Sequence, residues 1–214
     1  MTVLGRFPAL SGVDLDVMEG DAVLLSGPNG AGKSTLLRLI AGLVPLTGGE
    51  GQVLGRDLAR DRRSFRAEVA LLGHDTFCYD DLTAAENLRF HARAAGRPKA
   101  VADAVLERVG LGRSANVAHR LLSAGQKRRL ALGVVLAREA RLLLLDEPHA
   151  GLDAPGREIL DGAIADAKAS GRTVIVASHE LEQVRALVGR EVVMAGGHAS
   201  GGLVAEPDGD LVGV

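Results

Sequence analysis

Uninterrupted apolar runs recur along this chain and predict its main strands. Residues 22–27 (AVLLSG), 141–148 (RLLLLDEP) and 173–180 (TVIVASHE) each hold four consecutive apolar residues. Runs without alternation are typical of parallel strands that are buried on both faces. Weaker signals predict further strands or hairpins at residues 13–17, 51–55, 68–74 and 190–206.

Helical spacing of apolar residues fills the segments between these strands. Residues 34–43 follow the first run and end just before Pro45. Residues 157–171 connect the last two runs as a crossover helix, which completes a strand–helix–strand unit. From residue 82 to residue 140 the pattern is helical, apart from short loop signals.

Strands at both ends and helices in the middle predict one core interrupted by an insertion. The 214 residues are enough for a single well-buried α/β domain. We expect the core to comprise residues 1–75 and 141–214, and the inserted helical lobe to span residues 76–140.

Composition narrows the class of protein. Apolar residues make up 47%, charged residues 24% and aromatic residues 2%, and the formal net charge is −2. These values are typical of a globular protein. The slightly negative net charge does not attract nucleic acid, and few aromatic side chains are present to stack on bases, so we expect no nucleic-acid partner. The single cysteine excludes an internal disulfide framework. No apolar run approaches the roughly 18 residues of a membrane span, and no signal peptide is evident, so we expect a cytoplasmic protein.

The stretch GPNGAGKST at residues 27–35 carries the clearest chemistry. It follows a predicted strand, opens a predicted helix and fits the phosphate-loop pattern G-x-x-x-x-G-K-[ST]. In such a loop the backbone N–H groups surround the phosphates, the lysine faces the β- and γ-phosphates, and the serine hydroxyl can bind Mg²⁺. A chance glycine-rich turn is the alternative, which the strand–loop–helix context disfavours. The predicted ATP-binding residues are Gly27, Pro28, Asn29, Gly30, Ala31, Gly32, Lys33, Ser34 and Thr35.

Two adjacent carboxylates follow the leucine run at residues 142–145. Asp146, together with Ser34, is the predicted Mg²⁺ site, because this ion prefers oxygen ligands. Glu147 is placed to deprotonate an attacking water as a general base. Acidic residues also occur in ordinary turns after strands, but two together after an apolar strand favour catalysis. The two motifs predict a Mg²⁺-dependent nucleoside triphosphatase.

A second helix start with anion-binding features lies at residues 122–132, LSAGQKRRLAL. Ser123 can cap this helix, and Gln126 three places later completes a capping box. Free backbone N–H groups and the positive end of the helix dipole converge at such a start. One small chain therefore carries two candidate phosphate sites.

The stretch LSAGQ resembles the LSGGQ signature of the ATP-binding cassette (ABC) ATPases. AGLD at residues 150–153 resembles the D-loop of that family, and VASHE at 176–180 places His179 as its switch histidine, which contacts the γ-phosphate. The motifs follow the family's order over nearly the whole chain. The resemblance implies a P-loop NTPase (RecA-like) core with an inserted helical signature lobe and a small antiparallel β subdomain.

The resemblance also implies a use for the second helix start. In this family two cassettes dimerise head to tail, and each ATP lies between one chain's phosphate loop and the other chain's signature. The partner-site residues would be Leu122, Ser123, Ala124, Gly125, Gln126 and Asp153. The alternative is that Ser123 only caps an internal helix, and the sequence leaves both possibilities open.

Two residues depart from the family pattern. Ala124 stands where the first signature glycine is usual, and its methyl group slightly crowds a phosphate there. His74 stands at the position of the Q-loop glutamine, which contacts Mg²⁺ and relays the nucleotide state to the membrane partner. Imidazole is a poor Mg²⁺ ligand, so His74 is expected to act by hydrogen bonding to water or phosphate, or to be an ordinary loop histidine.

The adenine contact is the least defined part of the predicted site. The family often stacks the base on an aromatic residue before the first strand, and Phe7 is the one available here. The alternative is that Phe7 is a core residue beside Pro8 and Leu10.

One cassette without a membrane span resembles the separate ATPase subunit of a transporter, peripheral on the inner face of the cell membrane and bound to integral membrane subunits. LSAGQ, the Gly73-His74 pair and the short length resemble the haem-exporter type of ATPase that serves cytochrome c maturation. The alternative is a soluble ABC ATPase of DNA repair or translation. Such proteins carry long coiled-coil insertions or two fused cassettes, and the lobe here is short.

Overall fold

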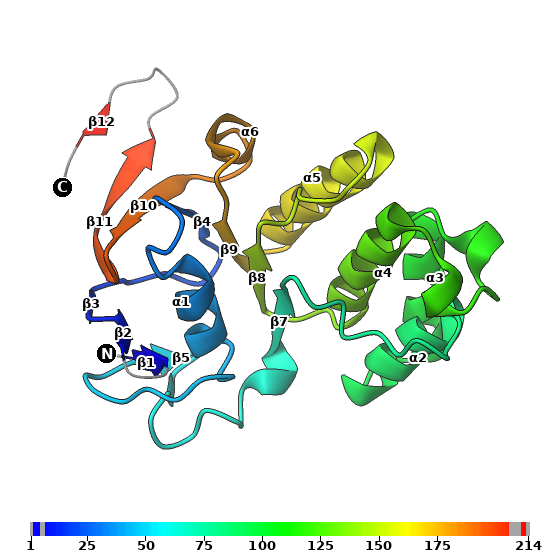
Figure 1. The fold of residues 1–214 in the computed structure, drawn as a ribbon, viewed down its shortest axis with the longest axis horizontal. Coiled ribbons are helices and arrows are strands. Elements are labelled where there is room, and N and C mark those ends of the chain that lie inside the picture. Colours follow the sequence, from blue (N-terminus) through cyan, green and yellow to red (C-terminus); the bar gives the residue numbers. More distant parts are fainter. Residues whose placement is uncertain (1, 5–6, 206–210, 213–214) are drawn as a thin grey trace.

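An eight-stranded sheet runs through the protein and organises the fold (Figure 1). The computed structural model describes residues 2–4, 7–205 and 211–212, and side chains within residues 10–199. The strand order is β12-β11-β10-β4-β9-β8-β7, with β3 beside β11. The strands are β3 Gly12–Val13, β4 Ala22–Ser26, β7 Val69–Leu72, β8 Leu142–Asp146, β9 Thr173–Ala177, β10 Arg190–Ala195, β11 His198–Ala205 and β12 Leu211–Val212.

The uninterrupted apolar runs form the parallel part of the sheet, as predicted. Strands β10, β4, β9, β8 and β7 run parallel to one another. Every residue of β4, β8 and β9 is buried. Successive side chains point to opposite faces of a strand, so helices must cover both faces of these three strands. The predicted hairpin is also present, since β10 and β11 pair antiparallel.

Each face of the sheet packs against different helices. Leu144 of β8 and Ile175 of β9 share a core with Leu37 of α1 (Lys33–Ile40). Leu145 shares the opposite core with Leu160 of α5 (Ala154–Ala169). That core continues into a group of three helices beside the sheet, α2 (Ala84–Ala94), α3 (Lys99–Arg108) and α4 (Ala124–Ala137) (Figure 1).

The remaining elements are short. Two separate antiparallel pairs, β1 (Thr2–Leu4) with β2 (Phe7–Leu10) and β5 (Gln52–Val53) with β6 (Arg56–Asp57), lie on the α1 side of the sheet (Figure 1). Helix α6 spans Leu181–Arg185, and single 3₁₀ turns occur at Arg66–Glu68, Gly112–Ser114 and His119–Leu121. None of the helices in the described ranges is long and apolar enough to cross a membrane.

The strand predicted at residues 13–17 is mostly wrong. Val13, Leu15 and Val17 are half-buried while Asp14 and Asp16 are exposed, so the alternation is real. However, β3 pairs with β11 through only two residues, Gly12 and Val13, and the chain then leaves the sheet. The side-chain pattern was correct, but the backbone pairing that defines a strand is a long-range contact.

Backbone pairing brings the ends of three strands level. Leu25 of β4 and Asp146 of β8 both pair with Ala177 of β9. The segments that leave these strands therefore start side by side at one edge of the sheet. In open α/β sheets this carboxyl edge is where ligands bind.

Candidate nucleotide site

The loop of residues 27–32 leaves β4 at this edge and needs glycine at defined positions. Gly27, Gly30 and Gly32 have φ angles of 129°, 80° and 101°, in the region that side chains disfavour. A Cβ on Gly27 would also overlap the carbonyl oxygen of Met194 in β10, whereas a Cβ on Gly30 would meet nothing within 4 Å. Gly27 is thus required by both conformation and crowding, and Gly30 by conformation alone.

Helix α1 begins at Lys33 and points its free N–H groups into this loop. Lys33 is only 6% exposed, and its Nζ donates to the carbonyl oxygens of Gly27 at 2.7 Å and Pro28 at 3.2 Å. These acceptors are neutral, so the hydrogen bonds leave the ammonium charge uncompensated. A buried cation at a helix start is a strong site for an anion.

Ser34 and Asp146 connect the loop to the leucine strand. The Ser34 hydroxyl donates to Oδ1 of Asp146 at 3.0 Å, and Asp146 is 4% exposed. The Ser34 hydroxyl and the Asp146 carboxylate thus lie together beside the start of α1. A hydroxyl and a carboxylate are ligands that Mg²⁺ prefers, so the residues present fit this ion. In the part of the chain that the structure describes, no cluster of three histidine, cysteine or acidic residues offers another metal site.

Glu147 has a strained backbone and a convergent set of donors. Its φ is 45°, the left-handed region that a side chain seldom adopts. Its N–H donates to the carbonyl oxygen of Ala177 at 2.8 Å. Its Oε2 lies 2.7 Å from Nδ1 of His179, and it accepts from the backbone N–H of His179 at 3.3 Å and the Ser178 hydroxyl at 3.5 Å.

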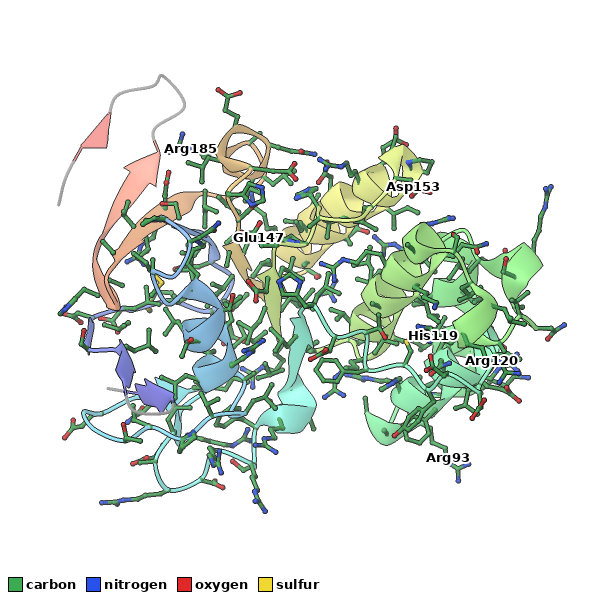
Figure 2. All side chains as sticks on the ribbon, viewed as in Figure 1. Arg93, His119, Arg120, Glu147, Asp153 and Arg185 are labelled. Carbon is green, nitrogen blue, oxygen red and sulfur yellow. The ribbon has the colours of Figure 1, made fainter. Side chains whose placement is uncertain are left out.

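The tautomer of His179 follows from this contact. An ionised carboxylate can only accept, so Nδ1 must carry the proton, and a neutral ring then has a free acceptor at Nε2. The His179 side chain is 65% exposed while that of Glu147 is 17% exposed. The pair therefore presents a sheltered carboxylate and an accessible imidazole at the edge of the sheet. Figure 2 shows Glu147 there, between the sheet and α5.

The predicted capping box of the second helix start is confirmed. The Ser123 hydroxyl accepts from the Gln126 N–H at 3.3 Å, and Gln126 Oε1 accepts from the Ser123 N–H at 2.9 Å. Leu122 is buried, whereas Ser123 and Ala124 are exposed. Across the described residues, no hydrogen bond joins this helix start to the loop of residues 27–35.

Asp153 lies beside this helix start in the same chain. It caps α5 by accepting from the Gly156 N–H at 3.1 Å, and its Oδ1 lies 3.6 Å from Nε of Arg129. A Cβ on Gly125 would come within 3.8 Å of its carboxylate. Asp153 and Glu147 are labelled at opposite ends of the segment that connects β8 to α5 in Figure 2.

The structure shows where the His74 side chain lies but does not describe the side chain of Phe7. His74 is exposed in the turn after β7, one residue beyond Gly73, at the same edge as Asp146. Phe7 lies in β2, but its side chain is outside the described residues, so its contact with adenine stays a prediction.

Arg128 is a residue at this edge that the sequence did not single out. It lies on α4, and its Nη1 and Nη2 donate to the carbonyl oxygens of Gly73 at 2.6 Å and Glu147 at 3.0 Å. Burial lowers the pKa of its guanidinium, and Asp146 opposes that effect. The available signal was the run Lys127-Arg128-Arg129 ahead of the apolar part of the helix, but the partners of Arg128 are distant in sequence.

A cavity of about 920 Å³ lies away from this chemistry. It is lined by residues 10–17, by residues 48–55 and by Leu36 and Leu39 of α1, and it reaches Leu142 and Thr173 at the amino ends of β8 and β9, the edge opposite Asp146. Burial raises the pKa of the Cys78 thiol to about 11, so it is protonated and unreactive near neutral pH.

Fold and site together define a P-loop nucleoside triphosphatase with a helical lobe. A family model described as "ABC transporter" matches residues 10–150. The chain belongs to this family, as an ATP-binding cassette ATPase. The resemblance on which the sequence prediction rested is therefore confirmed.

Individual relatives support the assignment. The chain is 41% identical over 181 residues to the cytochrome c biogenesis ATP-binding export protein CcmA of Bordetella bronchiseptica, covering 83% of this chain and 80% of that protein. It is 36% identical to the daunorubicin resistance ATP-binding protein DrrA3 of Streptomyces coeruleorubidus, over 98% of this chain and 69% of that one. The ATP-binding cassette MJ0796, solved as a post-hydrolysis dimer with ADP and phosphate, superposes with a TM-score of 0.85 at 26% identity, covering 92% of this chain and 91% of that one.

Two glycine substitutions test the geometry of the loop. Gly30→Ala should cost only backbone strain, about 1–2 kcal/mol, and keep nucleotide binding. Gly27→Ala should cost more and abolish binding, because the new methyl overlaps the Met194 carbonyl and displaces the loop. Urea unfolding and titration with a fluorescent ATP analogue measure both effects. Equal losses in the two variants would contradict the crowding at Gly27.

Proposed function

We propose that this chain is the ATP-hydrolysing subunit of an ABC transporter, which binds ATP and Mg²⁺ and powers transport by separate membrane subunits. One observation carries the proposal. The carboxyl edge of the sheet gathers a buried lysine at a helix start, the Ser34–Asp146 pair and the Glu147–His179 pair. These are the groups that ATP hydrolysis needs, on three loops that leave adjacent strands.

ATP binding is assigned to residues 27–35. The backbone N–H groups at the start of α1 and the ammonium of Lys33 bind the β- and γ-phosphates. Ser34 and Asp146 would hold Mg²⁺, which would neutralise charge on the phosphates. The hydrogen bonds of Lys33 to neutral carbonyls support this role, because they leave its charge for the phosphates.

Hydrolysis is assigned to Glu147 and His179. Glu147 takes a proton from the attacking water, whose oxygen bonds to the γ-phosphorus while the bond to the bridging oxygen breaks. The electron pair of that bond leaves with ADP. His179 holds the carboxylate in place through its Nδ1–H. Its other ring nitrogen, Nε2, donates a hydrogen bond to a γ-phosphate oxygen when it carries a proton. His74 faces the same edge and is assigned a hydrogen bond to water or phosphate.

A head-to-tail dimer is the proposed active form. The exposed start of α4 has the geometry of an anion site but makes no hydrogen bond to the chain's own phosphate loop, within the described residues. A second copy would place Ser123, Gly125 and Gln126 against the ATP of its partner, with Asp153 nearby. The dimeric cassette with bound ADP and phosphate among the structural relatives supports this arrangement.

A groove on the helical side is the proposed docking site for a membrane subunit. It has a volume of about 260 Å³ and is lined mostly by apolar residues, Leu43, Leu71 and Phe77 among them, with Arg66, His91 and Arg138 as its polar members. Phe77 and Tyr79 are each 52% exposed in the segment that follows His74. Exposed aromatic residues beside an apolar groove are typical of interaction sites. The cassette would thus sit on the inner face of the cell membrane.

The type of transporter is proposed from the relatives. Those named for cytochrome c biogenesis cover most of both chains, which supports haem export for cytochrome c maturation. A role in DNA repair or translation is less supported, because helices α2, α3 and α4 have only 11, 10 and 14 residues and form no long coiled coil.

The assigned chemistry predicts that substitutions at Glu147 and Lys33 block different steps, hydrolysis and nucleotide binding. Glu147→Gln keeps the shape but removes the base, so it should bind ATP, lose roughly 100-fold or more in hydrolysis and accumulate as a dimer on size exclusion. Lys33→Ala should fail at the earlier step and lose nucleotide binding. Phosphate release and equilibrium binding measure the two steps. Normal turnover by Glu147→Gln would place the base elsewhere.

Mixing two inactive variants tests the shared site. Lys33→Ala disables the phosphate loop, and Ser123→Arg puts a bulky cation at the signature. In the mixed dimer one site joins an intact loop to an intact signature, and the other carries both lesions. Activity should return on mixing, up to about half the wild-type rate per dimer if the sites act independently. One ATP trapped per mixed dimer should accompany it, and none would show that Ser123 only caps its helix.

The docking groove is tested by recovery from membranes. Phe77→Asp puts a charge at its mouth and should reduce co-purification with the membrane subunits roughly tenfold or more. Met18→Asp is the matched control, because Met18 is 70% exposed and does not line the groove. Equal co-purification of both variants would show that the membrane subunits dock on another surface.

A further inference from the structure

Arg128 joins three segments that carry proposed catalytic groups. It lies on α4, five residues after Ser123, and its guanidinium donates to Gly73 at 2.6 Å and to Glu147 at 3.0 Å. Gly73 directly precedes His74, and Glu147 directly follows Asp146. One side chain of the signature helix therefore holds the first residue after β7 and the first residue after β8.

The cost of this arrangement argues against a purely structural role. Arg128 is half-buried, and its Nε is buried with no partner among the described residues. Its two hydrogen-bond acceptors are neutral carbonyls, and burial lowers its pKa. An apolar side chain of similar volume often stabilises a protein as well as a buried ion does. The position thus retains a charge that folding alone does not need.

The strained backbone of Glu147 explains what the charge can do. A left-handed residue other than glycine is strained and persists only when its surroundings hold it. The Glu147 N–H donates to Ala177, and its carbonyl oxygen accepts from the Arg128 guanidinium at 3.0 Å and from the Ala150 N–H at 3.2 Å. The bond from Arg128 is the charge-assisted one of the two at the carbonyl. If it is lost, the weaker bond from Ala150 is left to hold the carbonyl, the backbone can relax toward negative φ, and the carboxylate then swings away from His179.

We propose that Arg128 is a positioning residue for ATP hydrolysis. It keeps Glu147 in the left-handed conformation that aims its carboxylate, and it fixes Gly73, and with it His74, at the same edge. This inference rests on the proposed ATPase function. It also gives a route of communication, because Ser123 and Arg128 are only about 7.5 Å apart along one helix. When the ATP of a partner chain binds at Ser123 and shifts α4, Arg128 on the same helix would shift the Glu147 carbonyl with it.

The experiment compares Arg128→Met with a matched control, Arg138→Met. Arg138 is the C-cap residue of the same helix. It donates from Nη2 to the carbonyls of Arg66 at 2.9 Å and Val69 at 3.3 Å, and it also has a buried, unpartnered Nε within the described part. Burial lowers its pKa too. Its contacts lie at the other end of β7, away from Glu147. The two variants therefore lose similar interactions at different places.

Arg128→Met should lower kcat roughly 10- to 100-fold and leave the KM for ATP within about twofold, because only the position of the base changes. Arg128→Lys should recover part of kcat, since an ammonium can reach one carbonyl. In the isolated cassette Arg138→Met should keep kcat, because the docking groove that Arg138 lines has no membrane subunit to bind there, and both methionine variants should have similar thermal midpoints. Equal slowing by the two methionine variants, or a raised KM at unchanged kcat, would overturn the proposal.

A double-mutant cycle with Glu147→Gln tests whether Arg128 acts through Glu147. If Arg128 acts through Glu147, Arg128→Met should have little further effect on single-turnover hydrolysis in the Glu147→Gln background. Multiplicative losses would overturn the role. A wild-type chain that hydrolyses no ATP would refute the proposed function and this role together, whereas an active wild type with additive variants would refute the role of Arg128 alone.

Discussion

The hydrogen-bonded ladder between β4, β9 and β8 is the constraint on which the site depends. It places Leu25, Ala177 and Asp146 level at one edge. The phosphate loop, the Glu147 turn and the Ser178-His179 segment then begin within hydrogen-bond reach of one another. A slip of one residue would turn Asp146 to the opposite face of the sheet and separate it from Ser34. Because these strands are apolar on both faces, helices must cover both.

The edge concentrates charge that the protein interior would otherwise exclude. Lys33 and Asp146 are buried, and Arg128 is half-buried beside them. Lys33 and Arg128 donate to neutral carbonyls, and Asp146 accepts from a hydroxyl. These partners are uncharged, so the groups keep their electrostatic influence for a ligand. Buried charges of this kind are costly for stability and are expected at functional sites.

Helix α4 occupies a special position in this arrangement. Its start is exposed and capped by Ser123, its side packs into the same core as the sheet, and Arg128 extends from it to the Glu147 carbonyl. In the proposed mechanism a displacement of its start reaches Glu147 through a rigid helix and the hydrogen bond from Arg128. The proposed head-to-tail dimer gives this exposed helix start a ligand, the ATP of the partner chain.

The sequence by itself determined the features that depend on neighbouring residues. The apolar runs predicted the buried parallel strands, the glycine and lysine spacing predicted the phosphate loop, and Ser123 with Gln126 predicted a capping box. These follow from local geometry: strand and helix periodicity, the φ angles open to glycine, and hydrogen bonds three residues apart. The tertiary structure alone decided which distant groups meet. The Glu147–His179 contact, the Ser34–Asp146 bond and the two bonds of Arg128 join residues 19 to 112 positions apart. The failed strand at residues 14–17 has the same origin, since alternation fixes which side chains face the core, but only a neighbouring strand can pair the backbone.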